Sequence, residues 1–175
     1  MKNKIFIILL MIFCLTSCSN NDSQITSSSN DYSSITPYIQ VERNEEKTFK
    51  EINVNEYISK MENKDSFIMF FYMTTCGACN SAKEKLLIPY MQETSIMIYA
   101  MDIKSEENYG NLVLMQQYQI LDNTYYYLKD DGSAGMKTPT ICIIDQGVTI
   151  NKHLGYSENL LNIIKAYCYL PEISA

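Results

Sequence analysis

Residues 66–79 read SFIMFFYMTTCGAC, and this stretch joins two patterns. Its first part, Ser66 to Met73, is a continuous apolar run rich in aromatic residues. A run of this length and composition is typical of a central β-strand that is covered on both faces. Cys76 and Cys79 follow, and a helical stripe of apolar and small side chains comes after them. The stretch therefore predicts a strand that turns into a helix, with a cysteine pair at the start of the helix.

A cysteine pair at the start of a helix has a distinct chemistry. The free backbone N–H groups and the helix dipole favour negative charge there, so we expect a thiol at this place to have a lowered pKa. The first cysteine of such a pair is usually exposed and the second lies in the first turn. This asymmetry suits disulfide exchange, in which Cys76 is the nucleophile and Cys79 resolves the mixed disulfide. Gly77 permits the close backbone turn between them.

The rest of the sequence alternates strand and helix patterns. Asn53 or Asn55 can cap a helix upstream of the apolar run. The elements expected downstream are a helix that Pro89 kinks or ends, a strand over residues 96–101, a helix over 106–118, a strand over 140–144 with a hairpin partner over 148–154, and a helix that Ser157 caps and that runs to about Leu170. Residues 121–137 show no clean period. The order of the elements predicts an α/β sandwich with a mixed sheet.

The sequence resembles the thioredoxin-like family over about residues 49–170. The resemblance rests on the apolar strand, Cys76-Gly77-Ala78-Cys79, Asp102 at a strand exit, Gln117-Tyr118-Gln119-Ile120, Thr138-Pro139-Thr140, the Gly147 turn, Gly155 and the last helix. It implies a thioredoxin-like three-layer sandwich, in which helices flank a mixed central sheet. Residues 121–137 would then be an insertion ahead of the family's cis-proline.

The resemblance also assigns roles around the cysteine pair. It implies that Pro139 is the cis-proline facing the pair, and that Thr138 offers backbone groups to a substrate strand. Thr75, Gly77 and Ala78 would form the active-site loop. The redox-active disulfide would serve in place of any cofactor.

Three positions depart from the family's most studied members. Thr75 replaces a tryptophan before the first cysteine, and Ala78 replaces a proline inside the pair. Phe70 stands where members often carry a buried acid that moves the proton of the second thiol. Water, the Cys76 thiolate or an acid from elsewhere would then do this work, or resolution is slow.

The first eighteen residues have the layout of a lipoprotein signal. Lys2 and Lys4 precede an apolar run over residues 5–15, which is too short for a membrane span of about 20 residues. The run ends in LTSC at residues 15–18, which resembles the bacterial lipobox. We therefore expect a signal peptide over residues 1–17 and acyl chains such as palmitate on Cys18, because two or more chains anchor stably. An ordinary cleaved signal with an incidental cysteine is the alternative.

The remaining chain divides into a tether and one domain. Residues 18–47 are rich in polar types and predict a flexible linker after the lipidated cysteine. Residues 48–175 form the predicted domain, in keeping with 175 residues and 46% hydrophobic content. The net charge of −6 argues against a nucleic-acid partner. We expect a membrane-anchored monomer that faces outside the cytoplasm, where disulfides persist.

The other cysteines and the single histidine leave alternatives open. Cys76 and Cys79 could be a permanent structural disulfide or half of a zinc site, but Cys142 and Cys168 do not form a second close pair, and we expect no metal. Those two thiols fit buried small hydrophobes, and a disulfide between them is possible. His153 lies in a predicted edge strand and is expected at the surface.

Two functional hypotheses follow. The first is an extracytoplasmic thiol–disulfide oxidoreductase that exchanges disulfides with secreted or membrane proteins containing cysteine, together with a membrane redox partner. The direction of exchange depends on the reduction potential of the pair. The second is a non-catalytic binding lipoprotein that keeps Cys76–Cys79 as a structural disulfide. The missing buried acid and the insertion favour the second hypothesis somewhat.

Overall fold

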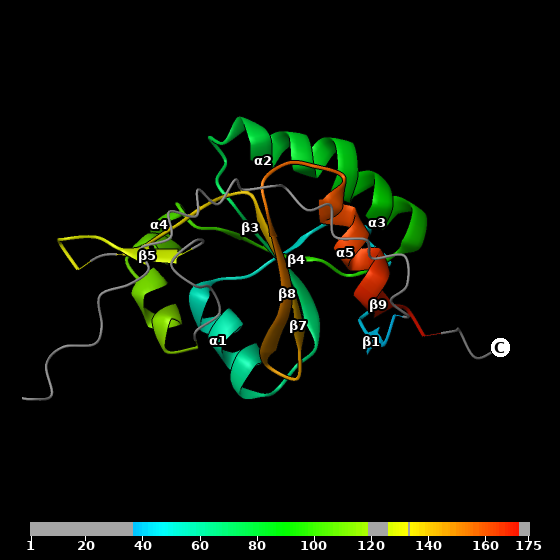
Figure 1. Ribbon diagram of the computed structural model, residues 1–175, viewed down its shortest axis with the longest axis horizontal. Helices are drawn as coiled ribbons and strands as arrows, with labels where there is room; N and C mark the ends of the chain where they lie inside the picture. The colour runs from blue at the N-terminus through cyan, green and yellow to red at the C-terminus, as the bar shows by residue number, and fades with distance from the viewer. Residues whose placement is uncertain (1–36, 119–125, 133, 172–175) are drawn as a thin grey trace, which may run out of the picture.

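The computed structural model describes residues 37–118, 126–132 and 134–171 (Figure 1). Its centre is a five-stranded mixed sheet in the order β2-β4-β3-β7-β8. The strands are β2 (Lys50–Glu51), β3 (Phe67–Tyr72), β4 (Tyr99–Asp102), β7 (Thr140–Asp145) and β8 (Val148–Leu154). Strands β2 and β3 run parallel to β4, whereas β7 runs antiparallel to β3 and β8. The predicted mixed sheet is therefore confirmed, with the apolar run at its middle.

Helices cover both faces of this sheet (Figure 1). One face carries α1 (Val54–Glu62), and η2 (Leu112–Tyr118) packs against this helix with the short α4 (Glu106–Tyr109) just ahead of it. The opposite face carries a continuous helical segment and the last helix. The segment consists of α2 (Gly77–Ala82), the π-helical turn η1 (Lys83–Leu87) and α3 (Ile88–Thr94), and the last helix is α5 (Asn159–Tyr167). The three-layer sandwich is thus confirmed.

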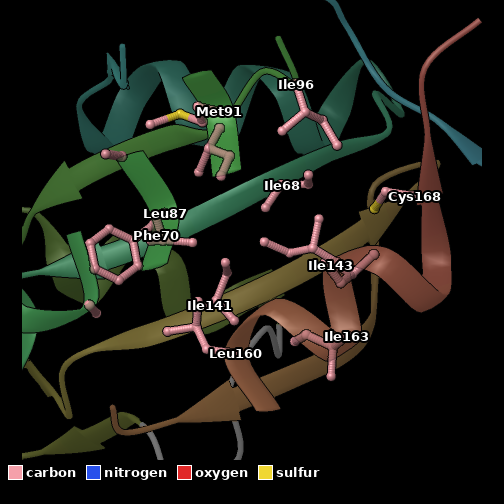
Figure 2. Close-up of a cluster of buried hydrophobic side chains, with 14 of the residues drawn as sticks. Ile68, Phe70, Leu87, Met91, Ile96, Ile141, Ile143, Leu160, Ile163 and Cys168 are labelled. Carbon is pink, nitrogen blue, oxygen red and sulfur yellow. The ribbon is translucent and has the colours of Figure 1, made fainter. Parts of the chain in front are cut away.

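Alternate side chains of β3 enter two different hydrophobic clusters. Phe67, Met69 and Phe71 pack with α1, whereas Ile68 and Phe70 pack with the helices on the other side. Figure 2 shows the second cluster, where residues of η1, α3 and α5 point toward β3 and β7. Every residue of β3 is buried. Burial of one large apolar side chain stabilises a fold by about 1.5–3 kcal/mol, so this strand is a major source of stability.

The start of α1 follows the expected capping pattern. Asn53 is the N-cap residue, and its side-chain oxygen accepts a hydrogen bond from the Glu56 backbone N–H at 2.9 Å. The Glu56 carboxylate accepts from the Asn53 backbone N–H, also at 2.9 Å. This reciprocal pair satisfies two N–H groups that the first turn leaves free. Of the two predicted caps, Asn53 is the one used.

Three predicted helices differ in detail from the structure. Pro89 does not end its helix: the π-helical turn η1 comes directly before it, and the backbone stays helical through Leu87 and Ile88 into α3. The helix predicted over residues 106–118 is broken near Gly110 into α4 and the 3-10 helix η2. The last helix begins at Asn159 and ends at Tyr167, and Glu158 rather than Ser157 holds the N-cap position.

The segment just before the domain is also ordered. Strand β1 (Ile39–Gln40) pairs in parallel with β9 (Cys168–Tyr169), and Ile39 and Val41 are buried. The predicted linker over residues 18–47 therefore differs from the structure over residues 37–47. The reason is that two alternating apolar residues within a polar stretch are too short a signal for a strand. Residues 1–36 lie outside the described part of the chain.

The described part of the insertion forms a small hairpin. Strand β5 (Tyr126–Leu128) pairs antiparallel with β6 (Ala134–Met136). Ala134 and Met136 are buried in the same cluster as Leu112 and Met115 of η2. The hairpin therefore extends the α1 side of the domain, and β6 leads directly toward Thr138. Among the described residues, no helix has the length and apolar character that a membrane span requires.

Candidate redox site

Cys76 and Cys79 form a disulfide where β3 gives way to α2. Cys76 is the N-cap residue of α2, and its Sγ atom accepts a hydrogen bond from the Cys79 backbone N–H at 3.1 Å. Cys76 is half-buried, whereas Cys79 is 0% exposed. The flanking residues Thr75, Gly77 and Ala78 are exposed. An incoming sulfur can therefore reach Cys76 directly and Cys79 only through it.

Local hydrogen bonds hold the loop that leads to Cys76. The Cys76 backbone N–H donates to the Met73 carbonyl oxygen at 3.1 Å. The Thr74 hydroxyl donates to an Asp102 carboxylate oxygen at 3.0 Å, and the other carboxylate oxygen accepts from the Lys104 backbone N–H at 3.0 Å. Asp102 thus ties the end of β4 to the redox loop. The sequence places Asp102 at the strand exit, but nothing in it indicates the contact with Thr74.

Thr138 and Pro139 lie beside the disulfide. The peptide bond between them is cis, as the resemblance implies. The Thr138 carbonyl oxygen lies 3.9 Å from the Cys76 Sγ atom, and Pro139 is buried. The Gly155 backbone N–H donates to the Pro139 carbonyl oxygen at 2.8 Å and joins the end of β8 to the same place. The structure therefore brings together Cys76, Thr138 and Pro139, which are far apart in sequence.

Phe70 occupies the position at which the resemblance implies a buried acid. Its side chain is 0% exposed, and its ring stacks on Tyr72 at 5.8 Å and on Phe49 at 5.7 Å between centroids. The Tyr72 hydroxyl donates to a Glu51 carboxylate oxygen at 2.9 Å. Burial raises the pKa of Tyr72, and the hydrogen bond to Glu51 raises it further. Sequence reasoning missed this polar contact, because the two-residue strand β2 has no periodic signal.

Cys142 and Cys168 are buried free thiols away from the redox pair. Cys142 belongs to the cluster on the α1 side and Cys168 to the cluster on the opposite side, so they do not meet each other. Burial raises the pKa of each thiol to about 12. Among the described residues, no cluster of three or more histidine, cysteine or acidic side chains could hold a metal. Cys18 lies outside the described residues.

His153 is half-buried on β8, which is an edge strand as predicted, rather than freely exposed at the surface. Its Nε2 atom lies 2.8 Å from the Ser157 hydroxyl oxygen. Burial lowers the pKa of the imidazole. This pair closes the turn into α5 and lies outside the contacts of the disulfide.

No family model matches the sequence, and no curated protein matches it. Thioredoxin O1 of Arabidopsis thaliana in its oxidized state is similar in structure, with 14% identity, a TM-score of 0.47, and coverage of 67% of this chain and 95% of that one. Thioredoxin f2 of Chlamydomonas reinhardtii has 15% identity, a TM-score of 0.48, and coverage of 67% and 94%. A mutant thioredoxin of Halobacterium salinarum has 16% identity, a TM-score of 0.47, and coverage of 72% and 96%. The strand order, the disulfide at the start of α2 and the cis-proline before β7 give the described part of this chain a thioredoxin-like fold.

Proposed function

We propose that this protein is a thiol–disulfide oxidoreductase with Cys76 as its nucleophile and Cys79 as its resolving thiol. The observation that carries the proposal is the asymmetry of the pair: Cys76 is half-buried at the helix start and Cys79 is fully buried behind it. The helix start favours a thiolate at Cys76, because free N–H groups and the dipole stabilise negative charge. The Cys79 N–H already points at the Cys76 sulfur.

The exchange runs in two balanced steps. In the reducing direction, the Cys76 thiolate attacks one sulfur of a substrate disulfide, and the other substrate sulfur leaves as a thiolate that takes a proton from water. The deprotonated Cys79 then attacks Cys76 and releases the second substrate thiolate. Two electrons pass from the protein dithiol to the substrate, and the oxidising direction reverses each step. The backbone of Thr138 is the proposed contact for the substrate segment, which binds in an extended form.

The proposed substrates are cysteine-containing secreted or membrane proteins, and a membrane redox partner would restore the working state of the pair. We further propose that residues 1–17 are removed as a signal and that acyl chains on Cys18 hold the protein at the membrane, outside the cytoplasm. The support is the charged start, the short apolar run and the LTSC sequence. A Cys18→Ser variant should move from the membrane fraction to the soluble fraction. Retention of that variant at the membrane would contradict the anchor.

Insulin reduction by the purified full-length chain, with dithiothreitol as the reductant that returns the Cys76–Cys79 disulfide to the dithiol after each cycle, tests the activity. We expect turnover by the unaltered protein, loss of turnover by Cys76→Ser, and unchanged turnover by Cys168→Ala, which alters a buried thiol away from the pair. Cys79→Ser should accumulate a mixed disulfide at Cys76, because nothing resolves it. Equal activity of the unaltered chain and the Cys76→Ser variant would overturn the proposal and favour a structural disulfide in a binding protein.

A further inference from the structure

A charged cluster lies one helical turn from Cys79. The Lys83 backbone N–H donates to the Cys79 carbonyl oxygen, so the two residues lie on one face of the same helix. The Lys83 Nζ atom is 3.7 Å from the Tyr72 ring centroid and 3.9 Å from a Glu51 carboxylate oxygen. Because helical side chains lean toward the N-terminus, we expect the Lys83 stem to lie over the turn that holds Cys79.

Glu51 reaches this cluster from the edge of the sheet. It lies in register with Ala100 of β4, and Ala100 lies in register with Phe70 of β3. Residues directly opposite each other in a sheet point to the same face, so Glu51 shares the face that α2 covers. The Tyr72 hydroxyl fixes the Glu51 carboxylate through their hydrogen bond of 2.9 Å. The lysine, the tyrosine and the glutamate thus form one connected group.

The surroundings of Cys79 make nearby charges important. Its side chain is 0% exposed and shares a hydrophobic cluster with Phe70, Tyr72 and Ala82. Cys142 shows what such burial does, since its pKa is raised to about 12. A buried thiolate therefore needs a nearby positive charge to form in the neutral range.

Three other titratable groups lie at the same end of the sheet as Cys79, and each has a known neighbour. Cys76 is the partner sulfur, Asp102 lies at the end of β4 beside Tyr72, and His153 lies beyond β7 next to Ser157. The side chain of Lys83 is only 21% exposed, whereas that of Glu51 is 52% exposed. Solvent therefore screens Glu51 more strongly than Lys83.

We propose that Lys83 and Glu51 set the charge state of the Cys79 sulfur in the reduced protein, with Lys83 stabilising the thiolate and Glu51 opposing that effect. This inference rests on the proposed function for its biological meaning, since Cys79 must lose its proton before it attacks Cys76. Lys83 is a positioning residue: its charge acts on the Cys79 sulfur, and its side chain is not proposed to contact the substrate. Tyr72 contributes by holding the carboxylate beside the ammonium group.

An NMR titration of the Cys79 Cβ carbon in the reduced full-length chain tests the inference. Lys83→Met should raise the pKa of Cys79 by about one unit, because it removes a nearby positive charge from a buried sulfur. Glu51→Gln keeps a hydrogen-bond acceptor for Tyr72 but leaves Lys83 uncompensated, so it should lower that pKa. Lys85→Met is the matched control, because Lys85 lies in the same helical turn but is exposed.

Opposite shifts in the two variants and no shift in the control are the expected result. Lys83→Arg keeps the charge and should titrate like the unaltered chain, which guards against a folding defect in Lys83→Met. Equal pKa values in Lys83→Met and Lys85→Met, or a shift of the wrong sign, would overturn the inference. If the unaltered chain shows no disulfide exchange, the proposed function is contradicted. The titration would still report how Lys83 and Glu51 affect the pKa of Cys79, so the two failures can be told apart.

Discussion

The Thr138 carbonyl oxygen lies 3.9 Å from the Cys76 Sγ atom, although the two residues are 62 positions apart. The sheet explains this proximity. Strand β7 pairs antiparallel with β3, and Thr140 lies in register with Phe71, so the start of β7 meets the end of β3. The loop with the disulfide follows β3, and Thr138 precedes β7. The proximity of Thr138 and Cys76 is therefore a consequence of strand pairing.

Thr138→Val separates backbone recognition from side-chain recognition. The Thr138 hydroxyl oxygen is buried and has no hydrogen-bond partner among the described residues. Its loss should leave stability unchanged or raise it by up to about 1 kcal/mol, since an unsatisfied polar group is removed. Insulin reduction should also be unchanged, because the proposed substrate contact is the backbone.

Thr140→Val is the matched control in the same segment. The Thr140 hydroxyl is buried and donates to the Lys137 carbonyl oxygen at 2.8 Å. Its removal should cost about 1 kcal/mol of the free energy of unfolding in denaturant titrations. If Thr138→Val abolished insulin reduction while the protein stayed folded, the backbone account of Thr138 would be wrong.

Alkylation of the reduced, folded chain should discriminate between its thiols. Among the four cysteines that the structure describes, iodoacetamide at neutral pH should label Cys76 first, because Cys79, Cys142 and Cys168 are buried. Burial also keeps the last two thiols protonated, since it raises each pKa to about 12. Unfolding should expose all of them, and peptide mass mapping identifies each labelled site. Labelling of Cys142 in the folded chain as fast as that of Cys76 would contradict the core arrangement.

Stability should fall at alkaline pH. The Cys142 thiol has a raised pKa of about 12 in the folded state against an ordinary value of 9.0, so the unfolded chain loses its proton first. This contribution is complete below pH 9.0 and is lost as the pH rises toward about 12. Burial also raises the pKa of Tyr90 to about 12, so it contributes in the same direction. Denaturant titrations at several pH values measure the loss, and a Cys142→Ala variant should show a shallower one. An equally steep loss in that variant would remove Cys142 from the explanation.

Phe70 should be a structural residue rather than a catalytic one. Phe70→Ala should lower the free energy of unfolding by about 3–5 kcal/mol, because it removes a fully buried ring that stacks on two others. Val148→Ala is the control, since Val148 is 61% exposed and should have little effect. Equal stabilities of the two variants in chemical denaturation would show that the ring does not support the core.

Strong patterns in the sequence predict most of the fold. The apolar run gives β3, and Asn53, one of the two expected caps, marks the start of α1, because the periodicity and the capping chemistry are both local. The cysteine pair is placed correctly for the same reason. The expected positions of Thr138 and Pro139 rest on the family resemblance, since no local pattern brings them to Cys76.

What the sequence does not predict depends on long-range pairing. Strands β1, β2 and β9 have two residues each and exist only because a partner strand lies beside them. The contacts of Lys83 with Glu51 and of Thr74 with Asp102 likewise join segments whose proximity follows from the register of the sheet. Such contacts carry no signal in the local sequence.

The equilibrium of Cys76–Cys79 with a glutathione redox couple tests the central claim most directly. The full-length chain is incubated at several ratios of reduced to oxidised glutathione, and the dithiol and disulfide forms are then trapped and separated by mass. We predict rapid and reversible interconversion of the two forms, and its loss in the Cys76→Ser variant. A disulfide that stays oxidised in the folded chain, yet is reduced by the same couple once the chain is unfolded, would contradict the claim.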